Sequence, residues 1–480
     1  MRKMSCSWAF LLLVSPILLA SHGLSEPESS IIAPMEEAEQ EALYLVLQDL
    51  VGKWWNGSEL YPDPCGWTQI QGVSCDLFDG LWYVTSLNIG PIFDNSLRCS
   101  QQARFNPLLF QLKHLRSLSF FNCFSRHQQI IIPSSNWKKL SGSLKTLEFR
   151  SNRGLVGGIP DDIVQLSELE SLVIVENSMD GELPTELGKL EHLKRLMLSG
   201  NHFVGRIPNS ICVSSTELLI MDLSRNLLTG PLPPCLRNLT SLLKLDLSDN
   251  RFDGSLPPEL GRLENLTLLD LRNNNFSGGL ARSLNGMASI QDLLLAHNPN
   301  LGGSLEETEW GNLRELTTLD FSHAGLTGAI PEAMAALKKL RYVALDGNGL
   351  TGSVSPEFAS LPCLGALYLN GNDFTGRLEF PQEFYQRLGK RFAPWGNPNL
   401  CYDIAETAEI IPYGVAQCKQ DHQELFSYAA RARARTEIWM TILCSWALFR
   451  VWTQECGGSG FEVTDSECIL EGSSVSDADL

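Results

Sequence analysis

The strongest candidates for a binding site in the sequence are four aspartates that recur at a nearly fixed interval, each preceded by leucine or methionine. Asp222, Asp246 and Asp270 are 24 residues apart, and Asp320 follows after another 50. Arg225 and Arg272 lie close to this set in the chain. Carboxylates gathered in one row would attract a basic peptide or the basic surface of a partner protein. The alternative is that they form an ordinary solvated surface.

The sequence lacks the motifs of the common catalytic and metal-binding sites. No H-E-x-x-H, Walker loop, G-x-S-x-G, H-R-D or D-F-G pattern occurs, and the 8 histidines are scattered. The net charge of −18 also argues against a nucleic-acid partner, because no basic surface is available to neutralise phosphates. We therefore expect a protein that is not an enzyme, that uses no metal or other cofactor, and that binds a peptide or protein.

The aspartates belong to a repeat. Short runs of the form L-x-L-x-x-N recur with intervals of 24 to 26 residues between their last positions. Those positions are held by Asn152, Asn177, Asn201, Asn226, Asn250, Asn274, Asn298, Asn348 and Asn372, with Ala324 in the one remaining place. A period of 20–29 residues with this core predicts a leucine-rich repeat solenoid, an α/β horseshoe of stacked coils.

Each residue type in the repeat has a physical role. The alternating leucines of a short strand point into the core, and the residues between them point out of the concave face. The asparagine lies inside the coil, where its amide can satisfy backbone groups at the turn. Ala324 cannot do this, so we expect an irregular coil there. A second motif of the form [LFM]-x-G-x-[ILV] follows each anchor position, with a proline after it in six copies, and its glycine permits a turn that a side chain would hinder.

The segments outside the regular coils define the domain organisation. Arg2 and Lys3 precede an apolar stretch that is typical of a secretory signal peptide. A second apolar run, residues 438–452, is shorter than the roughly 20 residues that span a bilayer. We predict the following segments: a signal peptide (1–23), an acidic linker (24–35), an N-terminal cap (36–83), about twelve coils (84–379), a C-terminal cap (380–418) and an irregular tail (419–480).

Secretion would change how asparagines and cysteines are interpreted. Extracellular cysteines favour disulfides over metal sites. Cys99 and Cys123 could join two coils, and Cys212 and Cys235 could either pair on the convex side or remain buried thiols. Each Asn-x-Ser/Thr triplet becomes a candidate N-glycosylation site. These triplets begin at Asn56, Asn238, Asn265 and Asn275.

Three stretches outside the generic repeat carry a family resemblance. They are YPDPCGWTQIQGVSCDLFDGLWYVTSL at 61–87, FNCF at 121 and RFAPWGNPNLC at 391–401. Together they resemble the Piriformospora indica-insensitive protein group, plant leucine-rich repeat receptor-like proteins without a kinase. The resemblance implies disulfide-closed caps, with Cys65 and Cys75 at the N-terminal end and Cys401 and Cys418 at the C-terminal end. It further implies a plasma-membrane protein that takes part in the response to a root-colonising endophytic fungus through a partner kinase.

The sequence is also compatible with a second class of function. The same coils could belong to a secreted apoplastic inhibitor of fungal wall hydrolases, similar to the polygalacturonase-inhibiting proteins. That group is shorter and lacks the LWYV and WGNPNLC stretches. The sequence predicts an extracellular location in both cases, and the candidate binding surface is the same concave face.

Overall fold

The computed structural model describes residues 33–91, 96–214, 217–280, 282–402 and 412–418. The predicted signal peptide, most of the acidic linker and the predicted tail with its apolar run lie outside the described residues. None of the helices in these ranges has the length and hydrophobicity that crossing a bilayer would require.

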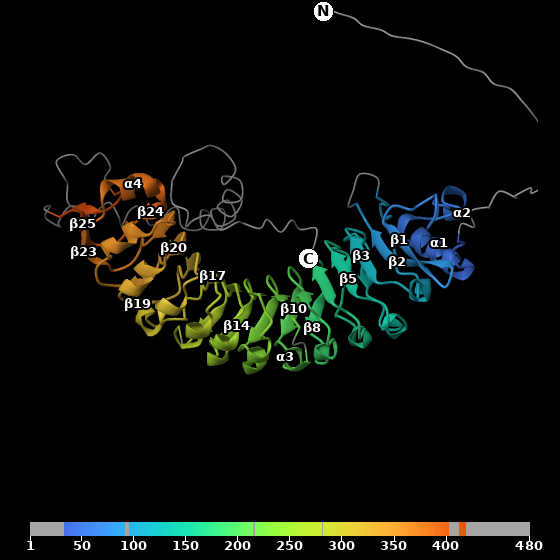
Figure 1. The fold of residues 1–480 in the computed structure, drawn as a ribbon, viewed down its shortest axis with the longest axis horizontal. Helices are drawn as coiled ribbons and strands as arrows, with labels where there is room; N and C mark the ends of the chain where they lie inside the picture. Colours follow the sequence, from blue (N-terminus) through green and yellow to red (C-terminus); the bar gives the residue numbers. More distant parts are fainter. Residues whose placement is uncertain (1–32, 92–95, 215–216, 281, 403–411, 419–480) are drawn as a thin grey trace, which may run out of the picture.

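One long sheet runs through the described part of the chain and lines the inner side of an arc of coils (Figure 1). It has 14 strands, and every neighbouring pair is parallel except the first, which is antiparallel. In order these are β1 (Val73–Phe78), β2 (Leu81–Ile89), β3 (Ser117–Phe121), β5 (Thr146–Arg150), β7 (Ser171–Val175), β9 (Arg195–Met197), β11 (Ile220–Asp222), β13 (Lys244–Asp246), β15 (Leu268–Asp270), β17 (Asp292–Leu294), β18 (Thr318–Asp320), β20 (Tyr342–Ala344), β22 (Ala366–Tyr368) and β24 (Phe392–Ala393).

The predicted solenoid is confirmed, and the burial pattern shows why these residues form it. In β13, Leu245 is fully buried, while Lys244 is exposed and Asp246 is partly buried on the concave side. The chain returns along the convex side through short 3₁₀-helices, several of which begin at or just after a proline. They are η1 (Pro107–Gln111), η2 (Trp137–Leu140), η3 (Asp161–Gln165), η4 (Leu187–Lys189), η5 (Pro234–Asn238), η6 (Pro258–Arg262), η7 (Arg282–Gly286), η9 (Trp310–Asn312), η10 (Glu332–Ala336) and η11 (Pro356–Ser360), with the short helix α3 (Ile211–Ser214) in the place between η4 and η5.

A second, shorter parallel sheet follows the first on successive coils. It contains β8 (Asp180–Glu182), β10 (His202–Gly205), β12 (Leu227–Gly230), β14 (Arg251–Ser255) and β16 (Asn275–Ser277). The sheet stops at β16 and resumes as the pair β19 (Thr327–Gly328) and β21 (Gly349–Leu350). The intervening coil carries an extra 3₁₀-helix, η8 (Leu305–Glu307). The irregular coil predicted at Ala324 therefore lies at this interruption.

The asparagines form a ladder through the core. The Nδ2 atom of Asn274 donates to the carbonyl oxygens of Leu247 and Leu271 at 3.0 and 3.1 Å, and its Oδ1 accepts from the Phe252 N–H at 3.0 Å. Each such side chain thus ties its own turn to the preceding coil. At the gap left by Ala324, the Oδ1 atom of Asn348 accepts from the Ala324 N–H at 2.9 Å. The alanine coil is therefore still tied to the coil after it.

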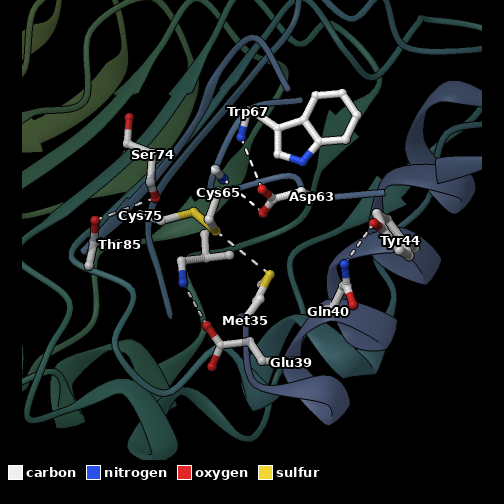
Figure 2. Close-up of a disulfide and its surroundings, with 12 residues drawn as sticks. Met35, Glu39, Gln40, Tyr44, Asp63, Cys65, Trp67, Ser74, Cys75 and Thr85 are labelled. Carbon is white, nitrogen blue, oxygen red and sulfur yellow. Dashed lines mark hydrogen bonds between the residues drawn. A yellow bond between two sulfur atoms is a disulfide. The ribbon is translucent and has the colours of Figure 1, made fainter. Parts of the chain in front are cut away.

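The N-terminal cap covers the first coil with the helix α1 (Glu37–Val51) and the short helix α2 (Gly57–Leu60). The apolar face of α1 is buried against the first coils. Within this face Glu39 is 1% exposed, and its Oε1 accepts from the Val84 N–H at 2.7 Å. Figure 2 shows the disulfide between Cys65 and Cys75 beside it.

Disulfides also occur at the other predicted positions. Cys401 is bonded to Cys418 in the C-terminal cap, which contains α4 (Gln382–Leu388), η12 (Gly389–Arg391), β25 (Asn399–Tyr402) and β26 (Ala416–Gln417). The strand β23 (Thr375–Leu378) of the last coil pairs with β25. Cys99 is bonded to Cys123, near the small sheet of β4 (Ile130–Ile131) and β6 (Leu155–Val156). Cys212 is bonded to Cys235, which decides the choice that the sequence left open in favour of pairing.

Candidate partner-binding surface

The four aspartates end strands of the long sheet and lie in one row on its concave face. Asp222 is in register with Asp246, and Asp246 with Asp270. The next strand places Leu294 in this row, and Asp320 follows on the strand after it. Since neighbouring strands are about 4.8 Å apart, the first three carboxyl groups form a close, unbroken set.

Serine hydroxyl groups two residues beyond the ends of these strands bond three of the carboxylates. The Oδ1 atom of Asp246 accepts from the Ser248 N–H at 3.0 Å and from its hydroxyl at 2.6 Å. Ser224 holds Asp222 and Ser322 holds Asp320 in the same way. The contact recurs because a serine occupies the same position of the repeat in all three coils. The Oδ2 atoms of Asp222 and Asp246 have no hydrogen-bond partner among the described residues.

Asp270 is held differently, by an arginine. It is 3% exposed, and it accepts from Arg272 Nε at 3.0 Å through Oδ1 and from Nη2 at 2.6 Å through Oδ2. This two-point ion pair neutralises one position in the middle of the row. The predicted flanking role of Arg225 needs correction, because Arg225 Nη2 instead lies 3.4 Å from Glu176 Oε1 on an earlier coil. Arg225 is three residues beyond Asp222, one position further than the residues that bond Asp246 and Asp270, and its guanidinium pairs with the carboxylate of Glu176.

Crowding and burial raise the proton affinity of the row. Burial, and then the charges of Asp270 and Asp222, raise the pKa of Asp246 to about 7, against hydrogen bonds from Ser248 that lower it. Burial also raises the pKa of Asp320. Burial lowers the pKa of Arg272, but hydrogen bonding to Asp270 and the nearby carboxylates outweigh this and keep Arg272 charged. The surface therefore gains negative charge as the pH rises through the neutral range.

The C-terminal half of the concave face contains residues that the sequence analysis missed. The rings of His297 and His323 stack with centroids 5.0 Å apart, and Tyr342 lies 5.5 Å from Tyr368 by the same measure. Burial raises the pKa of the nearby Asp346 to about 6. Aligning the repeats by the residue just before each anchor position would have revealed the histidine pair, since His297 precedes Asn298 and His323 precedes Ala324.

The N-terminal coils carry a different charge pattern. Glu170 lies between Lys145 and Lys194, with Oε–Nζ distances of 2.7 and 2.9 Å. Hydrogen bonds from these two lysines lower the pKa of Glu170. This ion-paired cluster lies just before β5, β7 and β9, whereas the carboxylate row begins at β11.

The four candidate glycosylation sites lie away from the long sheet. Asn56 precedes α2, Asn238 and Asn265 are on the convex side, and Asn275 begins β16 of the second sheet. All four side chains are exposed. Glycans at these positions would leave the aspartate row open to a partner.

Within the ranges that the structure describes, no cluster of three or more histidine, cysteine or acidic side chains is arranged to hold a metal ion. The concave row is thus a set of carboxylates fixed by serines and one arginine. The chemistry it offers is the binding of cationic or hydrogen-bond-donating groups.

Comparisons with known proteins agree with this architecture. A family model described as a leucine-rich repeat region matches residues 114–393. Piriformospora indica-insensitive protein 2 of Arabidopsis thaliana is 52% identical over 169 residues, which cover 35% of this chain and only 40% of that relative.

Solved structures of plant receptor ectodomains are similar as well. The Arabidopsis receptor kinase HAESA, in complex with the peptide hormone IDA and the co-receptor SERK1, matches with a TM-score of 0.54 and 28% identity over 63% of this chain and 49% of that one. The PEPR1–AtPEP1 complex matches with a TM-score of 0.58 and 26% identity over 76% of this chain and 51% of that one.

Proposed function

Because the chain belongs to the leucine-rich repeat proteins of the plant receptor-like type, we propose that it is a non-catalytic recognition protein of the cell surface. Its concave face would bind a basic peptide or the basic surface of a partner ectodomain. The observation that carries the proposal is the registered row of Asp222, Asp246 and Asp270 on adjacent strands. The HAESA complex, which contains a peptide hormone and a co-receptor, supports the general type of assembly.

The charge arrangement favours a cationic ligand over a neutral one. Arg272 cancels the charge of Asp270, while the Oδ2 atoms of Asp222 and Asp246 remain available to donors. The serines fix these two carboxylates before any ligand arrives, which reduces the entropy lost on binding. Lys145 and Lys194, which precede β5 and β9, would repel the basic end of a ligand and so set its direction along the arc.

The biological setting we propose follows the relative with the highest identity reported above. A role in the response to a root-colonising endophytic fungus, in growth promotion, symbiosis or defence, is supported by the similarity to Piriformospora indica-insensitive protein 2. Signalling would pass through a partner kinase, at the plasma membrane or from the apoplast. The runner-up is the secreted inhibitor of fungal wall hydrolases.

Affinity capture with the secreted protein tests the proposal. At pH 8, where Asp246 is ionised, Asp246→Lys reverses one charge of the row and leaves the Asp270–Arg272 pair in place, whereas Asp270→Lys would also disrupt that buried pair. The matched control is Asp253→Lys, an exposed aspartate on β14 of the second sheet. We expect equal secretion of all variants, capture of a receptor kinase by the parent and the control, and at least a tenfold loss of capture in Asp246→Lys.

Two outcomes would change this assignment. Undiminished capture by Asp246→Lys would remove the concave row as the binding surface. Failure to capture any kinase, together with inhibition of a fungal wall hydrolase by the purified protein, would replace the receptor role with the inhibitor role.

A further inference from the structure

A groove on the N-terminal cap lies beside one of the candidate glycosylation sites. It runs between α1 and the start of α2 and has a volume of about 380 Å³, within the range of small-molecule sites. One face of α1 lines it with Gln40, Tyr44, Leu45 and Gln48, and the other wall includes Asn56 itself. Asn56, a candidate attachment point for an N-linked glycan, is therefore one of the residues that line the groove.

The local geometry of Asn56 suits attachment of a sugar. The Ser58 hydroxyl donates to Asn56 Oδ1 at 2.9 Å, so the two polar residues of the triplet contact each other. The Asn56 Nδ2 atom, to which a glycan would be bonded, has no partner among the described residues. Asn265 differs, because its Nδ2 already donates to the Thr240 carbonyl oxygen at 2.9 Å.

The lining also matches the chemistry of a sugar. Gln40 and Gln48 use their Nε2 atoms to donate within the protein, Gln40 to the hydroxyl oxygen of Tyr44 at 3.0 Å and Gln48 to the Trp55 carbonyl oxygen at 3.1 Å (Figure 2 shows the first). Their Oε1 atoms remain available to accept from hydroxyl or acetamido groups. Tyr44 and the 38%-exposed Leu45 supply an apolar wall for the C–H face of a sugar ring.

We infer that an N-linked glycan on Asn56 lies with its first N-acetylglucosamine residues in this groove and completes the surface of the N-terminal cap. The occupant is part of the glycosylated chain itself. The inference is independent of the proposed recognition function and requires only passage through the secretory pathway. Asn275 begins β16 of the second sheet and is not among the residues that line this groove.

Site-resolved enzymatic release tests the inference. The full chain is secreted from cells that add high-mannose glycans, and a peptide N-glycosidase is applied to the native protein while each glycopeptide is followed by mass spectrometry. We expect release from Asn56 to be at least tenfold slower than release from Asn275. After reduction and unfolding, the two rates should agree within about twofold, because sequestration in the folded cap causes the difference.

A pair of leucine variants assigns the protection to the groove. Leu45→Ala removes an exposed lining side chain and should speed release from Asn56 severalfold, while Leu60→Ala, an exposed α2 residue outside the lining, should not. Equal native release rates at the two sites, an Asn56 that carries no sugar when Asn275 does, or an unchanged rate in Leu45→Ala would each overturn the inference.

Discussion

Replacing Asp246 with asparagine should stabilise the protein, by an amount that grows as the pH rises from about 4 to about 7. The carboxyl group has its pKa raised from 3.8 to about 7 by burial and by its neighbours Asp270 and Asp222. At about 1.4 kcal/mol per pKa unit, that rise corresponds to about 4 kcal/mol for carrying the charge in the fold. Water at the concave surface screens part of this cost, so we expect about 2 kcal/mol.

The sign follows from proton linkage. Between the unfolded pKa of 3.8 and the folded pKa of about 7, the folded protein holds the Asp246 proton and the unfolded chain releases it. The contribution of this group to stability therefore falls as the pH rises through that window. Asparagine carries no charge, and its Oδ1 can still accept from the N–H and hydroxyl of Ser248. Parent and variant should thus be equally stable near pH 4 and differ most at pH 8.

Differential scanning calorimetry at pH 4, 5.5, 7 and 8 measures this difference. We expect the Tm of Asp246→Asn to exceed that of the parent by roughly 2–4 °C at pH 8 and by almost nothing at pH 4. Asp253→Asn, on the exposed face of β14, is the control and should shift the Tm by less than about 1 °C at every pH. A Tm difference that is constant with pH, or that is negative at pH 8, would refute the reasoning.

Three further predictions concern buried polar groups, and chemical denaturation measures each. Arg272→Ala leaves the buried Asp270 unpaired and should lower the free energy of unfolding by about 3 kcal/mol. Arg225→Ala removes an exposed ion pair and should lower it by less than about 1 kcal/mol. Equal losses in the two variants would contradict the different roles assigned to the two arginines. Asn274→Ala strands backbone groups of two coils and should cost about 3 kcal/mol, so a loss below about 1 kcal/mol would argue against the ladder. Burial raises the pKa of Glu39 to about 7. Glu39→Gln keeps an acceptor oxygen, so this variant should be more stable than the parent above pH 7 and no more stable at pH 4. A variant that is more stable than the parent at pH 4 would exclude ionisation of Glu39 as the cause.

The repeat could be derived from the sequence because each coil presents the same physical problem. Every turn must bury alternating leucines and satisfy the same backbone groups, so the anchoring asparagines return at a constant interval. The row of Asp222, Asp246 and Asp270 follows from that spacing alone. The partners of these carboxylates were harder to predict, since they depend on whether a residue is two or three positions further along.

The two arginines illustrate this limit. Arg272, two residues after Asp270, bonds that carboxylate through its guanidinium, whereas Arg225, three residues after Asp222, pairs with Glu176 of an earlier coil. The histidine pair was missed because each histidine is unremarkable within its own coil, and only the stacking of coils brings their rings together. The Asn56 groove also depends on how two short helices pack, which no repeat period encodes.

The asparagine ladder extends one step beyond the last repeat predicted from the sequence. Asn397, in the WGNPNLC stretch, donates to the Leu369 carbonyl oxygen at 3.0 Å and accepts from the Phe374 N–H at 3.1 Å. The C-terminal cap therefore attaches through the same joint that links any two coils. An arc built this way can lengthen or shorten by whole coils during evolution while its closing piece stays unchanged, so the reach of the concave face can be adjusted without redesigning either end.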